Sequence, residues 1–147
     1  MRISAKGEYA IKAMVDLALH DGPELQPIQD IAARQSIPQR YLEQVLLQLK
    51  RAGFLYARRG SAGGYRLSKP ADQITVGALL RAVEGPAPGV DSPRRGGRGA
   101  GEDAAGLAEL WREIADAVAS VVDRTTLEDL RRRADERRSA ARPMYHI

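Results

Sequence analysis

Residues 54–69, FLYARRGSAGGYRLSK, place two short runs of strand-forming residues on either side of a glycine-rich stretch. FLYARR (54–59) and YRLSK (65–69) each predict a short strand, and the glycines of GSAGG (60–64) permit the positive φ angles that a hairpin loop requires. Nucleotide-binding loops follow the patterns G-x-x-x-x-G-K-S/T or G-x-G-x-x-G and lead from a strand into a helix. This stretch fits neither pattern, so we interpret it as a β-hairpin.

Three helices are predicted before this hairpin, each from apolar residues at helical spacing. They are expected at residues 4–20, 27–36 and 38–52, with Ser4 as the N-cap of the first and Pro27 in the first turn of the second. Three helices followed by a two-stranded hairpin is the order of elements in a winged helix-turn-helix. The sequence therefore predicts a mainly α fold with a small β-hairpin.

The second half of the chain predicts three further helices. The fourth helix is expected at residues 75–85, with Thr75 as its N-cap. A longer helix is expected at about 104–122, where apolar residues gather on one side. A capping box of Thr125 and Glu128 is expected to open the last helix.

A segment without helical pattern separates the fourth and fifth helices. Glycine and proline fill nine of the 17 positions in residues 85–101, so we expect a mobile loop there. The predicted organisation is a winged helix-turn-helix domain at 1–84, a flexible loop at 85–103, a pair of helices at 104–138 and a C-terminal tail at 139–147.

The composition excludes several kinds of site. The chain has 147 residues, 44% hydrophobic and 29% charged, which suits one globular domain with an appended element. It has no cysteine, which excludes disulfides, cysteine nucleophiles and metal or iron–sulfur sites held by thiolates. Two histidines, His20 and His146, are too few to suggest another metal site. Because Lys12 and Asp16 interrupt the most apolar stretch, we expect a cytoplasmic protein with no membrane span and no cofactor.

Positive charge is concentrated in the middle of the winged region. Between Arg34 and Lys69 there are eight basic side chains and one acidic side chain, Glu43, whereas the whole chain has a net charge of +4. Such a field attracts polyanions. The alternative interpretation is a solvated basic face with no partner.

The helix at 38–52 divides into a buried side and a polar side. Its apolar stripe consists of Leu42, Val45, Leu46 and Leu49. The opposite side has Arg40, Gln44, Leu47 and Arg51, flanked by Gln39, Tyr41 and Glu43. Arginine can pair with guanine and glutamine with adenine from a helix in the major groove of DNA. We therefore expect Arg40 and Gln44 to contact DNA, and we interpret Leu47 as a scattered apolar residue on the surface.

The hairpin loop complements that polar side. Arg58 and Arg59 precede residues with almost no side chain, so a cationic tip can approach phosphates or enter a narrow minor groove. We expect Tyr65 to anchor the returning strand inward. An enzyme is the weakest interpretation, because no nucleophile–base pair, carboxylate pair or ligand cluster is evident.

Several stretches resemble one family of bacterial winged-helix repressors, which includes the iron–sulfur cluster regulator and the cysteine-metabolism repressor. They are MRISAKGEYAIKAMVDLALH (1–20), IPQRYLEQVLLQLKRAGFL (37–55), RRGSAGGYRLSKPADQITVGALLRAVEGP (58–86), and LW (110–111) followed by TTLEDL (125–130). The resemblance implies a homodimeric repressor on a pseudo-palindromic site in double-stranded DNA.

The resemblance also assigns residues to the two interfaces. Together with the analysis of the helix and the hairpin, it gives a DNA-binding set of Arg2, Ser4, Lys6, Tyr9, Gln39, Arg40, Tyr41, Glu43, Gln44, Arg51, Arg58, Arg59, Gly60, Ser61, Gly63 and Gly64. The long helix is then the dimerisation helix, through Leu107, Leu110, Trp111, Ile114, Val118 and Val121.

Two features concern the signal that controls the protein. Family members that bind a cluster have three cysteines in the segment that corresponds to residues 85–101, and this chain has none, so sensing by a cysteine-held cluster is excluded. The last residues, RPMYHI, resemble tails that insert a terminal isoleucine into cysteine synthase. Tyr145, His146 and Ile147 are thus candidate partner-binding residues. A frayed tail is an equal alternative, and a module that acts mainly by docking an enzyme remains open beside the repressor.

Overall fold

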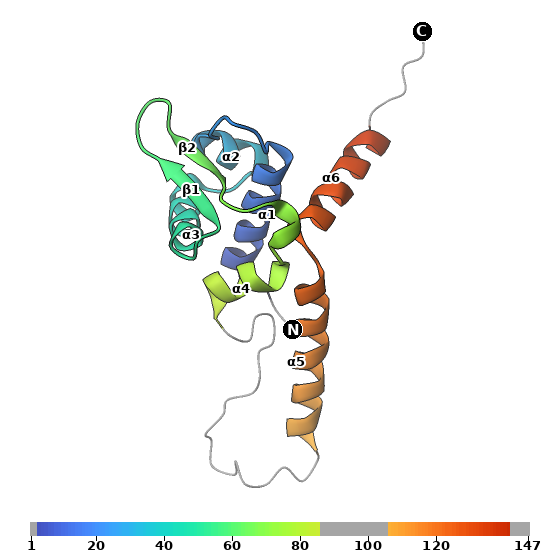
Figure 1. Cartoon of the computed structure of the whole chain (residues 1–147). Helices are drawn as coiled ribbons and strands as arrows, with labels where there is room; N and C mark the ends of the chain where they lie inside the picture. Colours follow the sequence, from blue (N-terminus) through green and yellow to red (C-terminus); the bar gives the residue numbers. More distant parts are fainter. Residues whose placement is uncertain (1–2, 86–105, 142–147) are drawn as a thin grey trace.

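The computed structural model describes residues 3–85 and 106–141 as six α-helices, one short 3-10 helix and one antiparallel hairpin (Figure 1). The elements are α1 (Ala5–Leu19), α2 (Ile28–Gln35), α3 (Gln39–Arg51), β1 (Leu55–Arg58), β2 (Gly64–Leu67), the 3-10 helix η1 (Ala71–Gln73), α4 (Val76–Glu84), α5 (Leu107–Arg124) and α6 (Leu127–Ala141). The predicted mainly α fold with a winged helix-turn-helix is confirmed. Most of the predicted loop at 85–103, Arg2 and residues 142–147 lie outside the described residues.

Helix α1 lies at the centre of the winged part and contacts α2, α3, α4 and α6. Its N-cap is Ser4, as predicted, with the Ser4 hydroxyl accepting a hydrogen bond from the Gly7 amide at 3.1 Å. The small residues Ala10 and Ala13 are completely buried, which lets neighbouring helices approach closely. Met14 and Leu17 extend the same buried side.

Helices α2 and α3 form the helix-turn-helix. Pro27 lies at the N-cap of α2 rather than in its first turn, because its backbone is extended, with ψ of 145°. Ser36 closes α2 in the left-handed conformation, with φ of 54°, and Ile37 is buried in the turn. The predicted stripe of α3 is confirmed: Leu42, Val45, Leu46 and Leu49 are all buried.

The hairpin pairs Leu55 with Leu67 and Tyr56 with Arg66. Leu55 and Leu67 are buried against the core, whereas Tyr56 and Arg66 are exposed on the other face. Both strands are shorter than predicted, and Gly64 belongs to β2 rather than to the loop.

Helices α5 and α6 join the winged part around the turn between them, through contacts with α1, η1 and α4. Leu127 is completely buried, and its amide donates to the carbonyl of Ile74 at 2.8 Å, beside an isolated bridge between Thr75 and Thr126. Arg81 of α4 also holds Asp123 of α5 through two hydrogen bonds of 2.7 and 2.8 Å. The C-terminal end of α5 lies beside α4, and the rest of the helix extends away from the hairpin (Figure 1).

The predicted capping box of α6 is wrong by one residue. Thr126 and Asp129 form it: the Thr126 amide donates to the Asp129 carboxylate at 2.9 Å, and the Asp129 amide donates to the Thr126 hydroxyl at 3.1 Å. The Thr126 amide and the Arg132 guanidinium both lower the pKa of Asp129. Thr125 instead closes α5, with its amide bonded to the Val121 carbonyl. Both Thr125–Glu128 and Thr126–Asp129 fit the capping-box pattern, but Thr125 is used to close α5, so the box forms at Thr126.

Leu127→Ala tests how strongly the junction stabilises the winged part. We expect a loss of about 3 kcal/mol in the free energy of unfolding, because a fully buried leucine is replaced by a cavity. Urea unfolding followed by circular dichroism measures it. Leu47→Ala, at an exposed position of α3, is the control and should change the stability by less than about 0.5 kcal/mol. Equal losses in the two variants would contradict a core role for Leu127.

Candidate nucleic-acid interface

The polar side of α3 is exposed along its whole length. Burial of the leucine and valine stripe against the core turns the opposite side of the helix outward, toward solvent. The exposed residues are Gln39, Arg40, Tyr41, Glu43, Gln44, Leu47 and Arg51, all of which the sequence placed there. Arg40 lies over the ring of its neighbour Tyr41, with 5.5 Å between the guanidinium carbon and the ring centroid. This helix face presents two arginines and two glutamines to solvent.

The hairpin depends on glycine at three positions, two in the loop and one at the start of β2. Gly60 has φ of 112°, a conformation that other residues rarely adopt. A Cβ atom on Gly63 would lie 2.1 Å from the Arg58 carbonyl oxygen, and one on Gly64 would lie 2.4 Å from the Gln26 carbonyl oxygen. The loop is therefore narrow because its backbone approaches neighbouring carbonyl groups more closely than a side chain would allow. Arg58, Arg59 and Ser61 are exposed on it.

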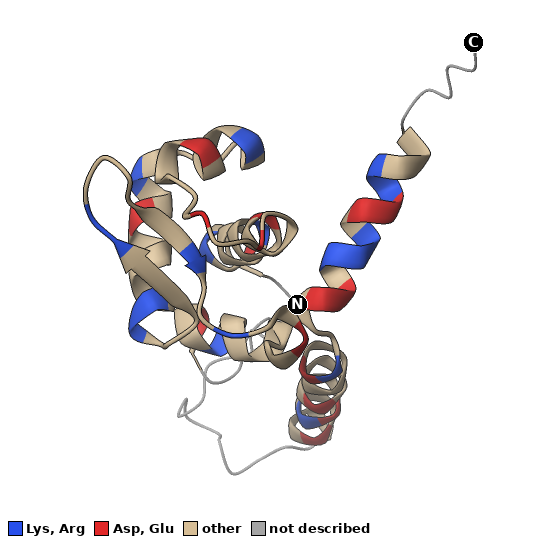
Figure 2. Cartoon of the chain, turned by 45° about the horizontal axis from the view of Figure 1, so that its top comes forward, with Lys and Arg blue, Asp and Glu red and all other residues tan. Residues whose placement is uncertain are grey.

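Most of the cations in the basic segment 34–69 have no carboxylate partner within the described part of the chain. Arg34 is the exception, since it pairs with Asp16. Arg66 and Lys69 lie instead over the rings of Tyr56 and Phe54, at 4.6 and 5.3 Å. The basic side chains of α3 and the hairpin thus outnumber the acidic ones, of which Glu43 is the member on α3, on the side away from α6, where blue segments appear in Figure 2.

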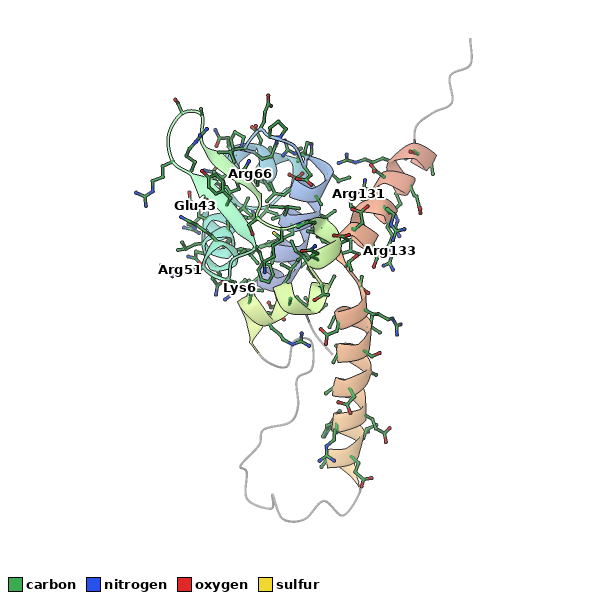
Figure 3. All side chains as sticks on the ribbon, viewed as in Figure 1. Lys6, Glu43, Arg51, Arg66, Arg131 and Arg133 are labelled. Atoms are coloured by element: carbon green, nitrogen blue, oxygen red, sulfur yellow. The ribbon has the colours of Figure 1, made fainter. Side chains whose placement is uncertain are left out.

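Glu43 of α3 interacts electrostatically with Tyr65 of the hairpin. Burial raises the pKa of the Tyr65 phenol, and the negative charge of Glu43 adds to this effect. Tyr65 is half-buried and packs against the core, which agrees with the predicted inward anchor. Figure 3 shows Glu43, Arg51 and Arg66 on the same side of the molecule, with Arg131 and Arg133 of α6 on the other.

The start of α1 differs from the prediction in one respect. Ser4 does not have free hydrogen-bond donors, because its amide donates to the Glu84 carboxylate at 2.9 Å and its hydroxyl also bonds to that carboxylate. Lys6 is exposed, and Tyr9 is half-buried against the core. No local pattern pointed to Glu84, because it is 80 positions away from Ser4 along the chain. An anion at this end of α1 would meet a carboxylate that is already bound there.

The apolar side of α5 is largely uncovered by the other described residues. No residue of this helix is buried, and Leu107, Leu110 and Val121 are 48%, 44% and 49% exposed. Trp111, Ile114 and Val118 are half-buried. The structure thus brings the six predicted residues to one surface. The predicted partner-binding residues Tyr145, His146 and Ile147 lie outside the described residues.

The described residues form neither a metal site of acidic, histidine or cysteine side chains nor a membrane-spanning helix. Within 3–85 and 106–141, no group of three or more histidine, cysteine, aspartate or glutamate side chains is arranged to hold a metal ion. None of the helices described is long and apolar enough to cross a membrane.

Comparison with known proteins links this geometry to a class of regulators. The profile of the Rrf2 family, described as iron-dependent transcriptional regulators, matches residues 3–133. The HTH-type transcriptional regulator IscR of Pectobacterium carotovorum is 39% identical over 132 residues, which cover 88% of this chain and 79% of that protein. IscR of Yersinia enterocolitica is 40% identical over 134 residues, with the same coverage.

Solved structures of similar fold are also regulators. CymR, the global cysteine regulator of B. subtilis, superposes with a TM-score of 0.75 at 37% identity and covers 89% of this chain and 96% of its own. IscR of T. potens superposes with a TM-score of 0.77 at 30% identity and covers 99% and 94%. These relatives are named as transcriptional regulators and not as enzymes. With its helix-turn-helix, its narrow basic wing and a match over most of its length, the chain belongs to the Rrf2 family of transcriptional regulators.

Proposed function

We propose that this regulator binds its operator as a homodimer and represses transcription, with α3 in the major groove and the hairpin, the wing, in the minor groove. One observation carries the proposal: the exposed polar side of α3 and the unpaired arginines of the wing lie on one side of the molecule. Family membership supports binding to DNA.

The charged and amide side chains of α3, Lys6 and the residues of the wing then have chemical roles. Arg40 and Gln44 have the donor and acceptor groups that pair with guanine and adenine edges, and Glu43 can accept from the amino group of cytosine. Lys6 and Arg51 serve as contacts to phosphates, which fix the register of the protein on the duplex. The glycines of the wing let Arg58 and Arg59 approach the sugar–phosphate walls of the minor groove.

Dimerisation through α5 accounts for its uncovered apolar side. A helix with exposed leucines and a half-buried tryptophan loses solvent-exposed apolar area when a second copy packs against it. A two-fold dimer places two α3 helices on half-sites about one helical turn of DNA apart, roughly 34 Å. The operator is accordingly pseudo-palindromic.

A second proposal concerns the regulated process. The absence of cysteine leaves no thiolate to hold an iron–sulfur cluster, although the family description refers to iron. The similarity to the global cysteine regulator of B. subtilis supports control of cysteine or sulfur metabolism. A complex with cysteine synthase as the signal rests on the resemblance of the last residues, RPMYHI, to tails that bind this enzyme. A module that acts mainly by docking this enzyme, with DNA binding secondary, is the alternative.

Arg59→Ala tests the wing. Binding to the operator should weaken by about tenfold. The negative slope of log K against log [salt] should become shallower by about one unit, because one phosphate contact is lost. Fluorescence anisotropy at several salt concentrations measures both quantities. Arg133→Ala is the matched control, since this arginine is also exposed but lies on α6 on the other side (Figure 3). If Arg59→Ala binds like the control, the wing takes no part in binding.

Trp111→Ala tests the dimer. We expect the dimer dissociation constant to rise by about 30-fold, as at an aromatic hot spot, with only a small change in the stability of the single chain. Sedimentation equilibrium measures the association. Arg112→Ala, at the exposed neighbouring position, should leave it unchanged. An unaltered dimer in Trp111→Ala would place the subunit contact elsewhere.

Removal of residues 142–147 tests the complex with cysteine synthase. The shortened protein should keep its affinity for DNA and lose any effect of added cysteine synthase on that affinity, because the proposed docking residues are gone. A gel shift on the upstream region of its own gene, with and without the enzyme, separates the two interpretations. An enzyme effect that survives the truncation would contradict docking through the tail.

A further inference from the structure

We propose that Arg34 does not contact DNA but is a positioning residue for the wing: with Asp16 and Gln26, it fixes the base of β2 against α1 and α2. This inference rests on the proposed function, in which the wing contacts DNA. It separates Arg34 from the other cations of the basic segment, among which its sequence position had placed it.

The anchor of this network is a buried charge. Asp16 of α1 is completely buried and is the single buried charged residue among those described. The Arg34 guanidinium binds its carboxylate with two hydrogen bonds, Nε to Oδ1 at 2.9 Å and Nη2 to Oδ2 at 2.8 Å. Gln35 adds a third hydrogen bond, to Oδ1 at 3.1 Å. A buried carboxylate needs such partners, so Asp16 holds Arg34 in one orientation.

Arg34, held in this orientation, also binds Gln26 in the segment before α2. Its Nη2 also donates to the side-chain oxygen of Gln26 at 3.0 Å. The guanidinium thus joins α1, α2 and Gln26, with its Nε and Nη2 atoms both used inside the protein. The hydrogen bond with Asp16 raises the pKa of Arg34, in keeping with a cation engaged by its partner.

Gln26 in turn holds the wing through its backbone. Its amide donates to the Tyr65 carbonyl and its carbonyl accepts from the Tyr65 amide, both at 2.9 Å. Gly64 makes this approach possible, since a Cβ atom there would collide with the Gln26 carbonyl. Gln26 is therefore a one-residue third strand beside β2, at the base of the loop with Arg58 and Arg59.

The chain of contacts runs from Asp16 through Arg34 and Gln26 to Tyr65. Every link in it is a hydrogen bond of 3.0 Å or less. The wing is a two-stranded hairpin, and such a hairpin is only marginally stable by itself. Its direction relative to α3 is then set by what holds its base, and the Arg34 network is the polar part of that support.

Amide hydrogen exchange at Tyr65 tests the support without DNA. In Arg34→Lys and in Gln26→Ala the Tyr65 amide should exchange about tenfold faster, because lysine cannot reproduce the two-pronged contact and alanine has no acceptor. Gln29→Ala, at an exposed position of α2, is the control and should exchange like the parent protein. Thermal unfolding of each variant verifies that the fold persists. Unchanged exchange in both test variants would overturn the proposal.

DNA affinity then shows whether the support acts through the wing. Gln26→Ala should weaken operator binding by about fivefold to tenfold, and this loss should largely vanish when Arg59→Ala is already present. The same loss should persist in full when Gln44→Ala is present, because Gln44 lies on α3 and not on the wing. If Gln26→Ala weakens binding by the same factor with and without Arg59→Ala, the inference is overturned.

Asp16→Asn distinguishes positioning from direct contact. If Arg34 binds phosphate, release of Arg34 from Asp16 should leave the affinity unchanged or strengthen it, whereas positioning requires a loss. Should the parent protein fail to bind any operator DNA, the proposed function is wrong, and the exchange of Tyr65 still decides whether Arg34 supports the wing. The two failures are thereby distinguishable.

Discussion

The burial of one side of α3 against α1 is the constraint on which the rest of the structure depends. Leu42, Val45, Leu46 and Leu49 leave water together, and four such side chains favour one rotation of the helix over any other. That rotation turns Arg40 and the residues beside it outward. The surface that can read DNA is therefore a consequence of packing, and no polar interaction within α3 is needed to orient it.

The wing owes its narrow shape to glycines and its direction to the buried residues and hydrogen bonds at its base. Gly63 and Gly64 allow backbone contacts that a Cβ atom would prevent. Leu55 and Leu67 bury one face of the hairpin, and the hydrogen bonds between Gln26 and Tyr65 fix its base. A two-stranded hairpin gains independent stability only from such packing. The arginines of the loop can thus stay exposed while their backbone is held.

Helix α4 links the parts that the proposed function assigns to DNA and to the second subunit. Two of its side chains, Arg81 and Glu84, bind the ends of other helices: Arg81 holds Asp123 of α5, and Glu84 holds Ser4 at the start of α1. Both pairs are exposed to solvent, so each contributes little to stability but fixes an orientation. The buried Leu127 supplies the apolar part of the same junction.

The sequence by itself determined the helices, the hairpin, the polar side of α3 and the glycine-rich wing, because periodicity, capping and turn preferences act between near neighbours. Even there, the predicted capping box of Thr125 and Glu128 was wrong by one residue, because Thr125 closes α5 and Thr126 opens α6 with Asp129. Only the tertiary structure decided which charged residues stay free. Arg34 and Lys6 look alike in the sequence, yet Arg34 is bound to Asp16, whereas Lys6 has no carboxylate partner among the described residues. Such partners come from distant parts of the chain, and packing of the helices, rather than local preference, brings them together.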